Sequence, residues 1–534
     1  MSEKFVVVVA DKISTVGLSA LTEDEHFEVL TNNDWGPDEI REAMSRAHAL
    51  IVRSTTKVNR ETLLAAPNLR IVGRAGVGVD NIDVGVLTER GIPVINAPAG
   101  NTVSAAELVM ALLFAVARKV VWADASVRNG DWTRSRFKGM EIRGKTLGII
   151  GAGRIGTEVA RRAQAFGMRT IVYDPYLSEE KADELELKRL PLRDVLAHGD
   201  VVSLHVPLTP STEGMIAASE LANMKSTAIL INAARGGIVD EAALVTALET
   251  GKIAGAALDV YCREPLPGDS PLRAAPNLVL TPHLGAATTE AQKFVAAEIA
   301  EGIRAALLEG DLSRALNAPV IGGEDLEHVR PLFSLAGKIG HVSGVLGRGG
   351  MRRVHISVAG VDEEILRPLS AAAMAGVLTP VVGGRNVNYV NALHIAGTRG
   401  IEVSTALLPE RVDYPQYLEL SLETGSRKVS IAGGLLGDQL HPRIVEMDGY
   451  QISVKPEGCL IVLRNKDVPG VIGKVGTLLA AHGVNIAEYR QVRKAEGEPA
   501  LAAISVDESV GYGLITELSA DDDIIEARAI HFSG

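Results

Sequence analysis

Residues 146–156 read TLGIIGAGRIG. Five strand-forming residues run into the pattern G-x-G-x-x-G, and Thr157–Phe166 then follow with the pattern of a helix. An acidic residue, Asp174, ends the next apolar run, 18 residues beyond Gly156. The glycine pattern alone is weak, but with a strand before it, a helix after it and an acidic residue at this spacing it forms the dinucleotide-binding fingerprint. We therefore expect a Rossmann-type unit that binds NAD.

Each part of this fingerprint has a physical task. Gly151 permits the tight turn, Gly153 lets the backbone approach the pyrophosphate, and Gly156 allows the helix to pack closely on the strand. The start of the helix, where Arg154 and Ile155 lie, offers free N–H groups and a positive dipole end to the phosphates.

Asp174 bears on the choice of cofactor. Its carboxylate can accept hydrogen bonds from both ribose hydroxyls, and its charge repels a 2′-phosphate, which favours NAD over NADP. The alternative is that Asp174 caps a helix that begins at Pro175.

Strands and helices alternate along the first 318 residues. Short apolar runs rich in β-branched residues lie between helical patterns such as Pro37–Ala47, as in βαβ units. The expected strands are Phe5–Val9, Ala49–Val52, Ile71–Gly73 and Val94–Asn96 in a first series, and Thr146–Ile150, Arg169–Tyr173, Val201–His205, Ala228–Asn232 and Gly255–Asp259 in a second. Two longer helices are predicted at Ser104–Val121 and Thr289–Glu309; the first is apolar nearly all round and should be buried between layers or subunits. The fold class is α/β, with two doubly wound, Rossmann-like domains.

The last part of the chain has a different order of elements. Residues 320–455 mix helical and strand patterns, which indicates an α+β unit, and carry no cluster of catalytic side chains. Beyond them the expected order is βαββαβ, the ferredoxin-like split βαβ arrangement. Its elements are strand Cys459–Arg464, helix Val471–His482, strands Val484–Val492 and Ala500–Val506, helix Tyr512–Ser519 and strand Ile524–Phe532.

Composition excludes several classes of function. The 534 residues carry a net charge of -12, which argues against a general nucleic-acid-binding surface. The two cysteines, Cys262 and Cys459, form no ligand cluster, so we expect neither a disulfide framework nor a metal site. The first ten residues read as a buried strand rather than a signal sequence, and we expect no apolar stretch near the roughly 20 residues of a membrane span. These features predict a cytoplasmic protein that binds neither nucleic acid nor membrane.

Three patches follow expected strands of the second series, where open α/β sheets bind ligands. They read AARGG at 233–237, DVYCREP at 259–265 and PHLGA at 282–286. His283 can take a proton near neutral pH, Glu264 can orient its imidazole, and Arg235 can hold a substrate carboxylate with two hydrogen bonds. Taken alone, His283 could be an ordinary strand-end histidine, Glu264 a surface carboxylate and Arg235 a loop arginine. Together they favour oxidation of a hydroxy acid.

These ordered motifs resemble the D-isomer-specific 2-hydroxyacid dehydrogenase family over residues 1–318. The likeness implies that Arg235 binds the substrate carboxylate, that Glu264 pairs with the histidine and that His283 is the acid/base. It also implies a nucleotide-binding domain, residues 99–287, inserted into a substrate-binding domain, residues 1–98 and 288–318. Besides the fingerprint, the implied NAD-binding positions are Pro207, Ala233, Ala234, Arg235, Asp259, His283, Gly285 and Ala286.

Motifs near the N-terminus narrow the substrate. The stretches VRSTTK at 52–57, GRAGVGVDN at 73–81 and GNTVSAAE at 100–107 resemble the branch of the family that oxidises 3-phosphoglycerate. Two arginines follow expected strands and can face a shared cleft, and two more in WTRSR at 132–136 occupy a region that in the family reaches the phosphate from a neighbouring subunit. For the second pair, decoration of an exposed loop is the open alternative. The substrate-binding residues implied are Arg53, Ser54, Arg74, Asn101, Arg134 and Arg136.

The tail supports the same branch. Residues 319–455 resemble the intervening domain of its long-form members, and residues 456–534 resemble an ACT domain, a module that often binds amino acids. The likeness implies a homotetramer and control by L-serine, whose synthesis this branch opens. The implied effector residues are Asn465, Asp467, Gly470 and Asn485, although Asn465 departs from the larger residue of some relatives. A module that only supports subunit contacts is the alternative.

Two other functions remain open at this point. One is a dehydrogenase for a different 2-hydroxy acid, such as glycerate or hydroxypyruvate; the arginine clusters and the two added domains argue against it. The other is a non-catalytic, NAD-sensing binding protein, because such proteins keep much of the same core. The acidic charge and the ACT-like tail favour the enzyme.

Overall fold

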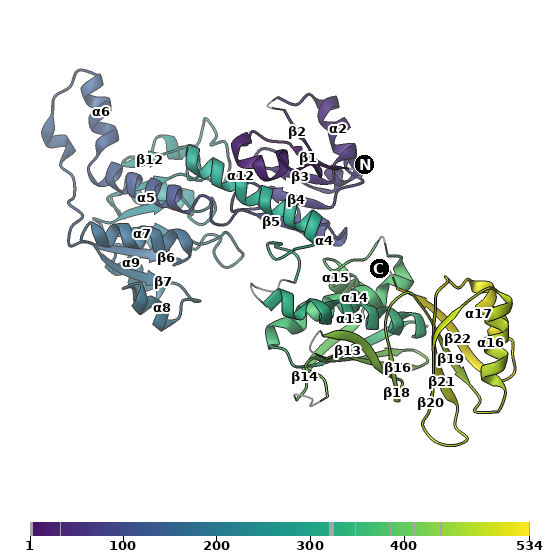
Figure 1. The fold of residues 1–534 in the computed structure, drawn as a ribbon. Helices are drawn as coiled ribbons and strands as arrows, with labels where there is room; N and C mark the ends of the chain where they lie inside the picture. Colours follow the sequence, from purple (N-terminus) through teal and green to yellow (C-terminus); the bar gives the residue numbers. More distant parts are fainter. Residues whose placement is uncertain are drawn as a thin grey trace.

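The computed structural model describes residues 4–32, 34–319, 325–347, 349–384, 386–409, 413–437 and 440–532, and Figure 1 traces their fold. The first of four sheets is parallel throughout, as expected. Its strands, in spatial order, are β2 (Phe27–Thr31), β1 (Phe5–Val9), β3 (Ala49–Val52), β4 (Ile71–Arg74) and β5 (Val94–Asn96). The sequence does not predict β2, because only Phe27 of this edge strand is buried and no apolar run marks it.

Helices cover both faces of the first sheet, which makes it doubly wound. One face packs against α2 (Pro37–Arg46), α3 (Arg60–Ala65) and α4 (Val84–Glu89). The other face packs against α1 (Ser19–Thr22) and α12 (Thr289–Arg304). Helix α12 continues into a π-helical segment, η4 (Ala305–Glu309), so the predicted helix 289–309 is present over its whole length. It brings the chain back to the first sheet after the second sheet is complete.

The second sheet is also parallel and has seven strands. In spatial order they are β12 (Leu278–Leu280), β11 (Gly255–Leu258), β10 (Ile229–Asn232), β9 (Val201–Leu204), β6 (Thr146–Ile150), β7 (Arg169–Tyr173) and β8 (Lys188–Arg189). Its helices are α5 (Thr102–Ala117), α7 (Arg154–Ala165), α8 (Glu179–Glu184), α9 (Leu192–His198), α10 (Ala218–Asn223) and α11 (Glu241–Glu249). The strand order reverses between β6 and β9, and such a switch point is where open α/β sheets bind ligands.

The long apolar helix expected at Ser104–Val121 is two helices. Helix α5 ends at Ala117, Lys119 has a left-handed backbone with φ 53°, and α6 (Val120–Arg128) starts in a new direction. Half of the residues of α5 are buried, as predicted, but no residue of α6 is. Helix α6 projects from the body of the molecule (Figure 1), so the prediction of one buried helix was wrong at its C-terminal end.

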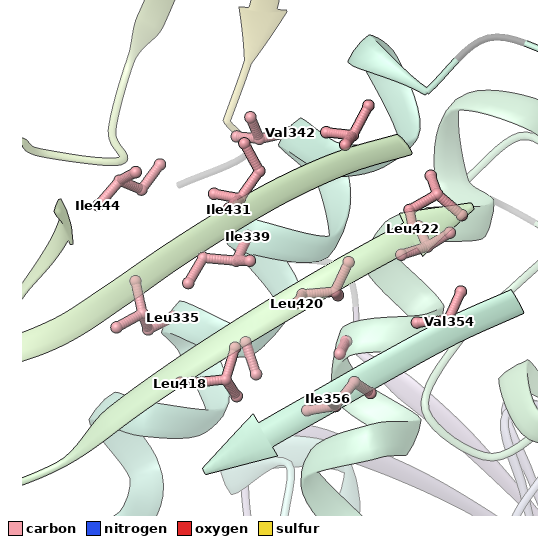
Figure 2. Close-up of a cluster of buried hydrophobic side chains, with 14 of the residues drawn as sticks. Leu335, Ile339, Val342, Val354, Ile356, Leu418, Leu420, Leu422, Ile431 and Ile444 are labelled. Atoms are coloured by element: carbon pink, nitrogen blue, oxygen red, sulfur yellow. The ribbon is translucent and has the colours of Figure 1, made fainter. Parts of the chain in front are cut away.

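The third sheet is mainly antiparallel. Its strands, in spatial order, are β14 (Glu402–Leu407), β13 (Met351–Ala359), β15 (Tyr417–Thr424), β16 (Lys428–Leu436), β17 (His441–Met447) and β18 (Tyr450–Val454). Three helices accompany it: α13 (Asp325–Leu346), α14 (Leu366–Val382) and α15 (Ala392–Thr398). Figure 2 shows the aliphatic core between α13 and the sheet, where Leu335 and Ile339 meet Leu418, Leu420 and Ile431. This is the α+β unit that the sequence predicts.

One helix in the described part of the chain is long and apolar enough to cross a membrane, Glu363–Val382. No such stretch was expected from the sequence. In the structure more than half of it is buried, and Leu369, Met374 and Val377 belong to the same core as α13. It is therefore a core helix of the third unit.

The fourth sheet is antiparallel and has the order β20-β21-β19-β22. Its elements are β19 (Cys459–Asn465), α16 (Val471–Ala481), β20 (Ile486–Arg493), β21 (Ala500–Val506), α17 (Tyr512–Ser519) and β22 (Ile524–His531). This confirms the predicted βαββαβ order, with ends within two residues of prediction. The two helices cover one face. The other face contributes Leu460, Val462 and Ile530 to the core of the third unit, so the last two units share apolar packing.

Candidate active site

The glycine-rich loop lies between β6 and α7 at the switch point. Gly151 has φ 95°, and a Cβ there would lie 2.7 Å from the carbonyl oxygen of His205. A Cβ at Gly156 would lie 2.1 Å from the carbonyl oxygen of Gly151, so the helix packs directly on the loop. At Gly153 a Cβ would meet no described atom within 4 Å. Gly151 and Gly156 are thus required by contacts within the protein itself. The open side of Gly153, by contrast, fits the approach of a dinucleotide phosphate.

Helix α7 starts at Arg154, three residues before the predicted start. Gly153 is its N-cap and has extended backbone. The N–H groups of Arg154 and Ile155 therefore belong to the first helical turn, where they have no partner within the helix and can bind an anion.

Asp174 follows β7 and faces this loop. Its Oδ2 accepts a hydrogen bond from the N–H of Ala152 at 2.8 Å, and its Oδ1 accepts one from Tyr176 at 2.9 Å. The next helix, α8, begins five residues later and is capped by Ser178. The alternative that Asp174 caps a helix is therefore wrong. Each of its oxygens accepts a single backbone hydrogen bond and keeps a lone pair for a further donor beside the fingerprint.

His283 and Glu264 are in direct contact, at 2.7 Å between Nδ1 and Oε2. Glu264 follows β11, and its other oxygen accepts a hydrogen bond from the N–H of Tyr261 at 3.1 Å. His283 follows β12 with φ 54°, and its N–H donates to the carbonyl oxygens of Asp259 and Thr281. Backbone contacts thus fix both partners, while their side chains stay partly exposed to a ligand.

Asp259 lies beneath this pair and is fully buried. Its carboxylate accepts hydrogen bonds from Thr281 Oγ1 at 2.6 Å and from the N–H groups of Leu284 and Gly285 at 2.7 and 3.0 Å. Burial raises the pKa of this carboxyl, and these hydrogen bonds oppose the rise. In the structure Asp259 therefore holds the loop that carries His283.

Tyr261 supports the same loop and was not found from the sequence. Its hydroxyl donates to the carbonyl oxygens of Leu258 and Thr281, at 3.1 and 2.8 Å. Burial raises the pKa of this hydroxyl to about 12, so it stays a donor at neutral pH.

Arg235 follows β10 on the same edge of the sheet. Asn232 shapes its turn, because Oδ1 accepts from the N–H of Ala234 at 3.1 Å and Nδ2 donates to the carbonyl oxygen of Arg235 at 2.9 Å. The guanidinium Nε lies 3.3 Å from Oδ2 of Asp80, which comes from the first unit. Arg235 therefore spans the two Rossmann-like units.

Two more arginines lie near Arg235. The pKa of the Arg74 guanidinium is lowered to about 10, mainly by burial and then by the positive charge of Arg235. Arg53 lowers it further. A Cβ at Gly76 would lie 1.6 Å from Nη1 of Arg74, and one at Gly78 would lie 2.0 Å from Nη2 of Arg235. Both guanidinium groups thus lie against one glycine-rich loop, and the Nε of Arg74 is buried without a partner in the described residues.

The loop that carries Arg53 is held by two residues that the sequence did not single out. Asp11 accepts from the N–H groups of Arg53 and Thr56, at 2.6 and 3.2 Å. Asn81 donates to the carbonyl oxygens of the same two residues, at 2.9 and 2.6 Å. Arg53 also lines a small pocket with Ala286 of the second unit. Asp11 and Asn81 bind backbone groups of residues far away in the sequence, so no local sequence pattern reveals their role.

The other predicted site residues fall into two groups. Those near the ligand-binding edge of the second sheet are Pro207 after β9, Ala233 and Ala234 after β10, and Gly285 and Ala286 after β12. Ser54 lies beside Arg53, and Asn101 lies at the start of α5. The Oδ1 of Asn101 is buried and has no partner among the described residues. By contrast, Arg134 and Arg136 lie in the exposed segment η2 (Arg134–Phe137), beside the projecting α6. Neither is among the charges that act most strongly on Arg74 in the described part of the chain, so one copy does not bring them to the other arginines.

The effector candidates do not meet in one copy of the chain. Asn465 is buried at the end of β19, and Asp467 pairs with Arg493 at 2.5 Å, near the start of α16 at Gly470. Asn485 precedes β20 at the opposite end of the sheet and donates to Asp507 at 2.6 Å. One copy of the chain therefore holds these candidates in two separate groups.

Comparisons with known proteins define the class. Residues 110–285 match the model for the NAD-binding domain of D-isomer-specific 2-hydroxyacid dehydrogenases. A crystal structure of a protein from Thermus thermophilus aligns with a TM-score of 0.54 at 38% identity, over 58% of this chain and 100% of that one. A glyoxylate reductase from Paecilomyes thermophila aligns with a TM-score of 0.53 at 32% identity, over 59% and 99%. The fold is that of an NAD-binding dehydrogenase of this class.

Relatives of full length narrow the family. Residues 328–448 match the model of the D-3-phosphoglycerate dehydrogenase intervening domain. A D-3-phosphoglycerate dehydrogenase of Archaeoglobus fulgidus is 39% identical over 527 residues, which cover 98% of this chain and 99% of that one. The Synechocystis enzyme of the same name is 41% identical over 526 residues, covering 98% and 94%. The chain belongs to the D-3-phosphoglycerate dehydrogenase family, in its long form of about this length.

Proposed function

We propose that this enzyme oxidises 3-phospho-D-glycerate to 3-phosphooxypyruvate with NAD, as the first step of L-serine synthesis. The observation that carries the proposal is the contact of 2.7 Å between His283 and Glu264, on the sheet edge that also holds the glycine-rich loop and Arg235. Family membership and these groups together account for each part of the reaction.

His283 is proposed as the base. Its Nδ1 is engaged by Glu264, so Nε2 is the ring nitrogen that can take the proton of the substrate hydroxyl. The negative charge of Glu264 stabilises the imidazolium that forms. NAD, when bound, would accept the hydride from the carbon that carries this hydroxyl. In the reverse direction His283 returns the proton to the carbonyl oxygen.

The arginines are proposed to orient the substrate. Arg235 binds the carboxylate beside the reacting carbon, and Arg53 with Arg74 binds the phosphate. A dianionic phosphate suits this cluster. Among the described residues, the main charges that act on the Arg74 guanidinium are those of two further arginines and two carboxylates, Asp80 and Asp11, so the group keeps an excess of positive charge. This excess of positive charge disfavours an unphosphorylated 2-hydroxy acid as the main substrate. The match to the intervening domain and to full-length enzymes disfavours a purely NAD-sensing protein.

The residues of the fingerprint are proposed to hold NAD. The first turn of α7 faces the pyrophosphate, and Asp174 accepts hydrogen bonds from the ribose hydroxyls. Asp259 acts through the 283–285 loop, since its oxygens are occupied by that loop.

We also propose the division of labour among the parts of the chain. Residues 1–98 and 288–318 bind substrate, 99–287 bind NAD, 319–455 form the intervening domain and 456–534 form an ACT-type regulatory domain. The enzyme is a cytoplasmic homotetramer. The exposed α6 segment contacts a second copy, and Arg134 and Arg136 reach that copy's substrate site. L-Serine is the proposed effector.

The decisive experiment follows NADH formation with 3-phosphoglycerate, D-glycerate and D-lactate, each with NAD and with NADP. The proposal requires kcat/KM to be highest for 3-phosphoglycerate with NAD. A preference for D-glycerate would reassign the substrate, and no turnover of any hydroxy acid by enzyme that binds NAD would favour the sensing protein.

A further inference from the structure

We propose that Asp80 is a positioning residue that decides which end of the substrate Arg235 receives. It admits the singly charged carboxylate and directs the doubly charged phosphate to Arg53 and Arg74. The inference rests on the proposed function, in which these arginines bind one substrate, and it gives a role to a carboxylate that no part of the reaction above uses.

The geometry places Asp80 at the mouth of the arginine cluster. Its Oδ2 lies 3.3 Å from Nε of Arg235, yet its side chain is 70% exposed. A Cβ at Gly78 would lie 2.0 Å from Nη2 of Arg235 and 2.8 Å from Oδ2 of Asp80. Arginine and carboxylate therefore lie together over the same glycine, on the loop against which Arg74 also rests. A ligand that approaches Arg235 from solvent meets the charge of Asp80 at once.

The second carboxylate near the cluster cannot play this part. Both oxygens of Asp11 are occupied, by the N–H groups of Arg53 and Thr56 and by the hydroxyl of Thr56. Asp11 thus shapes the loop that carries Arg53. Among the carboxylates whose charge acts on Arg74, Asp80 is the exposed one.

The charge of Asp80 discriminates between the two ends of the substrate. A negative charge a few ångströms from a bound anion repels a dianion about twice as strongly as a monoanion. Since the site is open to solvent and salt, we expect about threefold weaker binding of a monoanion and about tenfold weaker binding of a dianion at Arg235. Asp80 forms its ion pair with Arg235 and none with Arg53 or Arg74, although its charge also acts on Arg74 from a greater distance. The repulsion is therefore strongest at Arg235, and the phosphate is favoured at the other two arginines.

A reversed substrate is unproductive. With the phosphate on Arg235, the phosphate-bearing carbon takes the place of the hydroxyl-bearing carbon next to His283, and no proton is within reach of the base. Unproductive binding lowers kcat and KM together and leaves kcat/KM intact. A loss of Asp80 therefore has a kinetic signature that differs from a loss of folding.

The test compares Asp80→Asn with Asp80→Glu, which keeps the charge, and with Asp83→Asn. Asp83 is an exposed carboxylate of the same segment that caps α4 through the N–H of Val86 at 3.0 Å. Steady-state kinetics with 3-phosphoglycerate give kcat and KM. Inhibition constants for inorganic phosphate and for acetate report a dianion and a monoanion, and calorimetric titration with the same two anions reports binding without turnover.

For Asp80→Asn we expect kcat to fall several-fold while kcat/KM does not fall. Phosphate should bind at Arg235 about tenfold more tightly and acetate about threefold, whereas phosphate at Arg53 and Arg74 should bind nearly as in the wild type. Asp80→Glu and Asp83→Asn should resemble the wild type in the ratio of the two constants. A fall in kcat/KM with weaker or unchanged anion binding would overturn the proposal and leave Asp80 a structural residue. Failure of the wild type to oxidise 3-phosphoglycerate is a separate result, which would overturn the proposed function, whereas the anion titrations still test Asp80.

Discussion

Glu264 and His283 are 19 residues apart in the chain, yet Oε2 and Nδ1 lie 2.7 Å from each other. The two residues follow adjacent parallel strands, β11 and β12, so the sheet brings them to the same edge. Because Nδ1 is held, the ring has one orientation and presents Nε2 to the ligand side.

Replacement of His283 should separate chemistry from cofactor binding. We predict that His283→Ala lowers kcat by about 10²–10⁴-fold, because the proton acceptor is lost. NAD binding measured by calorimetry should stay within a few-fold of the wild type, since the glycine-rich loop and Asp174 are untouched. His198→Ala, at an exposed helix-end histidine that contacts its own helix, is the control. Near-native turnover in His283→Ala would assign the base elsewhere.

Glu264→Gln tests the pairing directly. The amide can still contact the ring but carries no charge to stabilise the imidazolium that forms as the proton is taken, so kcat for oxidation should fall at least tenfold. The measurement is kcat and KM with 3-phosphoglycerate. An unchanged kcat would mean that Glu264 has no influence on the base.

Asp174 should control the choice between NAD and NADP. We predict that Asp174→Ser weakens NAD binding and raises the ratio of kcat/KM for NADP to that for NAD by at least tenfold, because the charge that repels a 2′-phosphate is gone. Thermal unfolding without cofactor serves as the control, since the hydrogen bond to Ala152 is also lost. An unchanged cofactor ratio in a folded variant would place selectivity in another residue.

The sequence predicted nine strands of the two parallel sheets to within one residue, and missed β2, β8 and β12. The central parallel strands β6 and β9 are buried along their whole length and are mostly apolar, with one polar residue each, Thr146 and Ser203. The edge strand β2 has one buried residue and left no such signal. The break between α5 and α6 was missed because Val120 and Val121 continue the apolar pattern, although in the structure each is at least half exposed.

The site shows a similar limit. His283, Glu264 and Arg235 were predictable because their residue types match a reaction and their motifs follow strands. Asp11, Asn81 and Asn232, by contrast, act on backbone groups and could as well be turn residues in the sequence. Their role follows only from the three-dimensional contacts.

Arg74 should matter more for a phosphorylated substrate than for an unphosphorylated one. Arg74→Ala removes a charged donor from a largely buried position, and we expect a loss of about 2–3 kcal/mol in transition-state binding of 3-phosphoglycerate. D-Glycerate should lose much less, and kcat/KM for the two substrates is the measurement. Arg70→Ala, an arginine just before the same strand that lies over the ring of Phe5, is the control. Equal losses for both substrates would mean that Arg74 serves the common carboxylate or the fold.

The regulatory module should bind L-serine only between two copies of the chain. Asp467 and Gly470 lie at one end of the fourth sheet and Asn485 at the other, so a single copy cannot bring them to one small ligand. Asp467 can hold the ammonium group, while Asn485 can bind the carboxylate or hydroxyl. We predict that calorimetric titration of L-serine shows binding to the intact enzyme, and that Asp467→Asn and Asn485→Ala each abolish it.

Two further experiments make this prediction specific. Arg493→Gln breaks the same ion pair as Asp467→Asn from the other side, and it should keep serine binding if the carboxylate itself is the ligand. Mixing Asp467→Asn with Asn485→Ala subunits should restore about one intact site in each mixed pair, which a site within one copy could not do. Serine should then lower kcat without raising KM for 3-phosphoglycerate, because two distinct sites are coupled rather than in competition. If millimolar serine gave no heat of binding with the intact enzyme, the prediction would be wrong. If serine raised only KM and left kcat unchanged, it would bind at the active site instead.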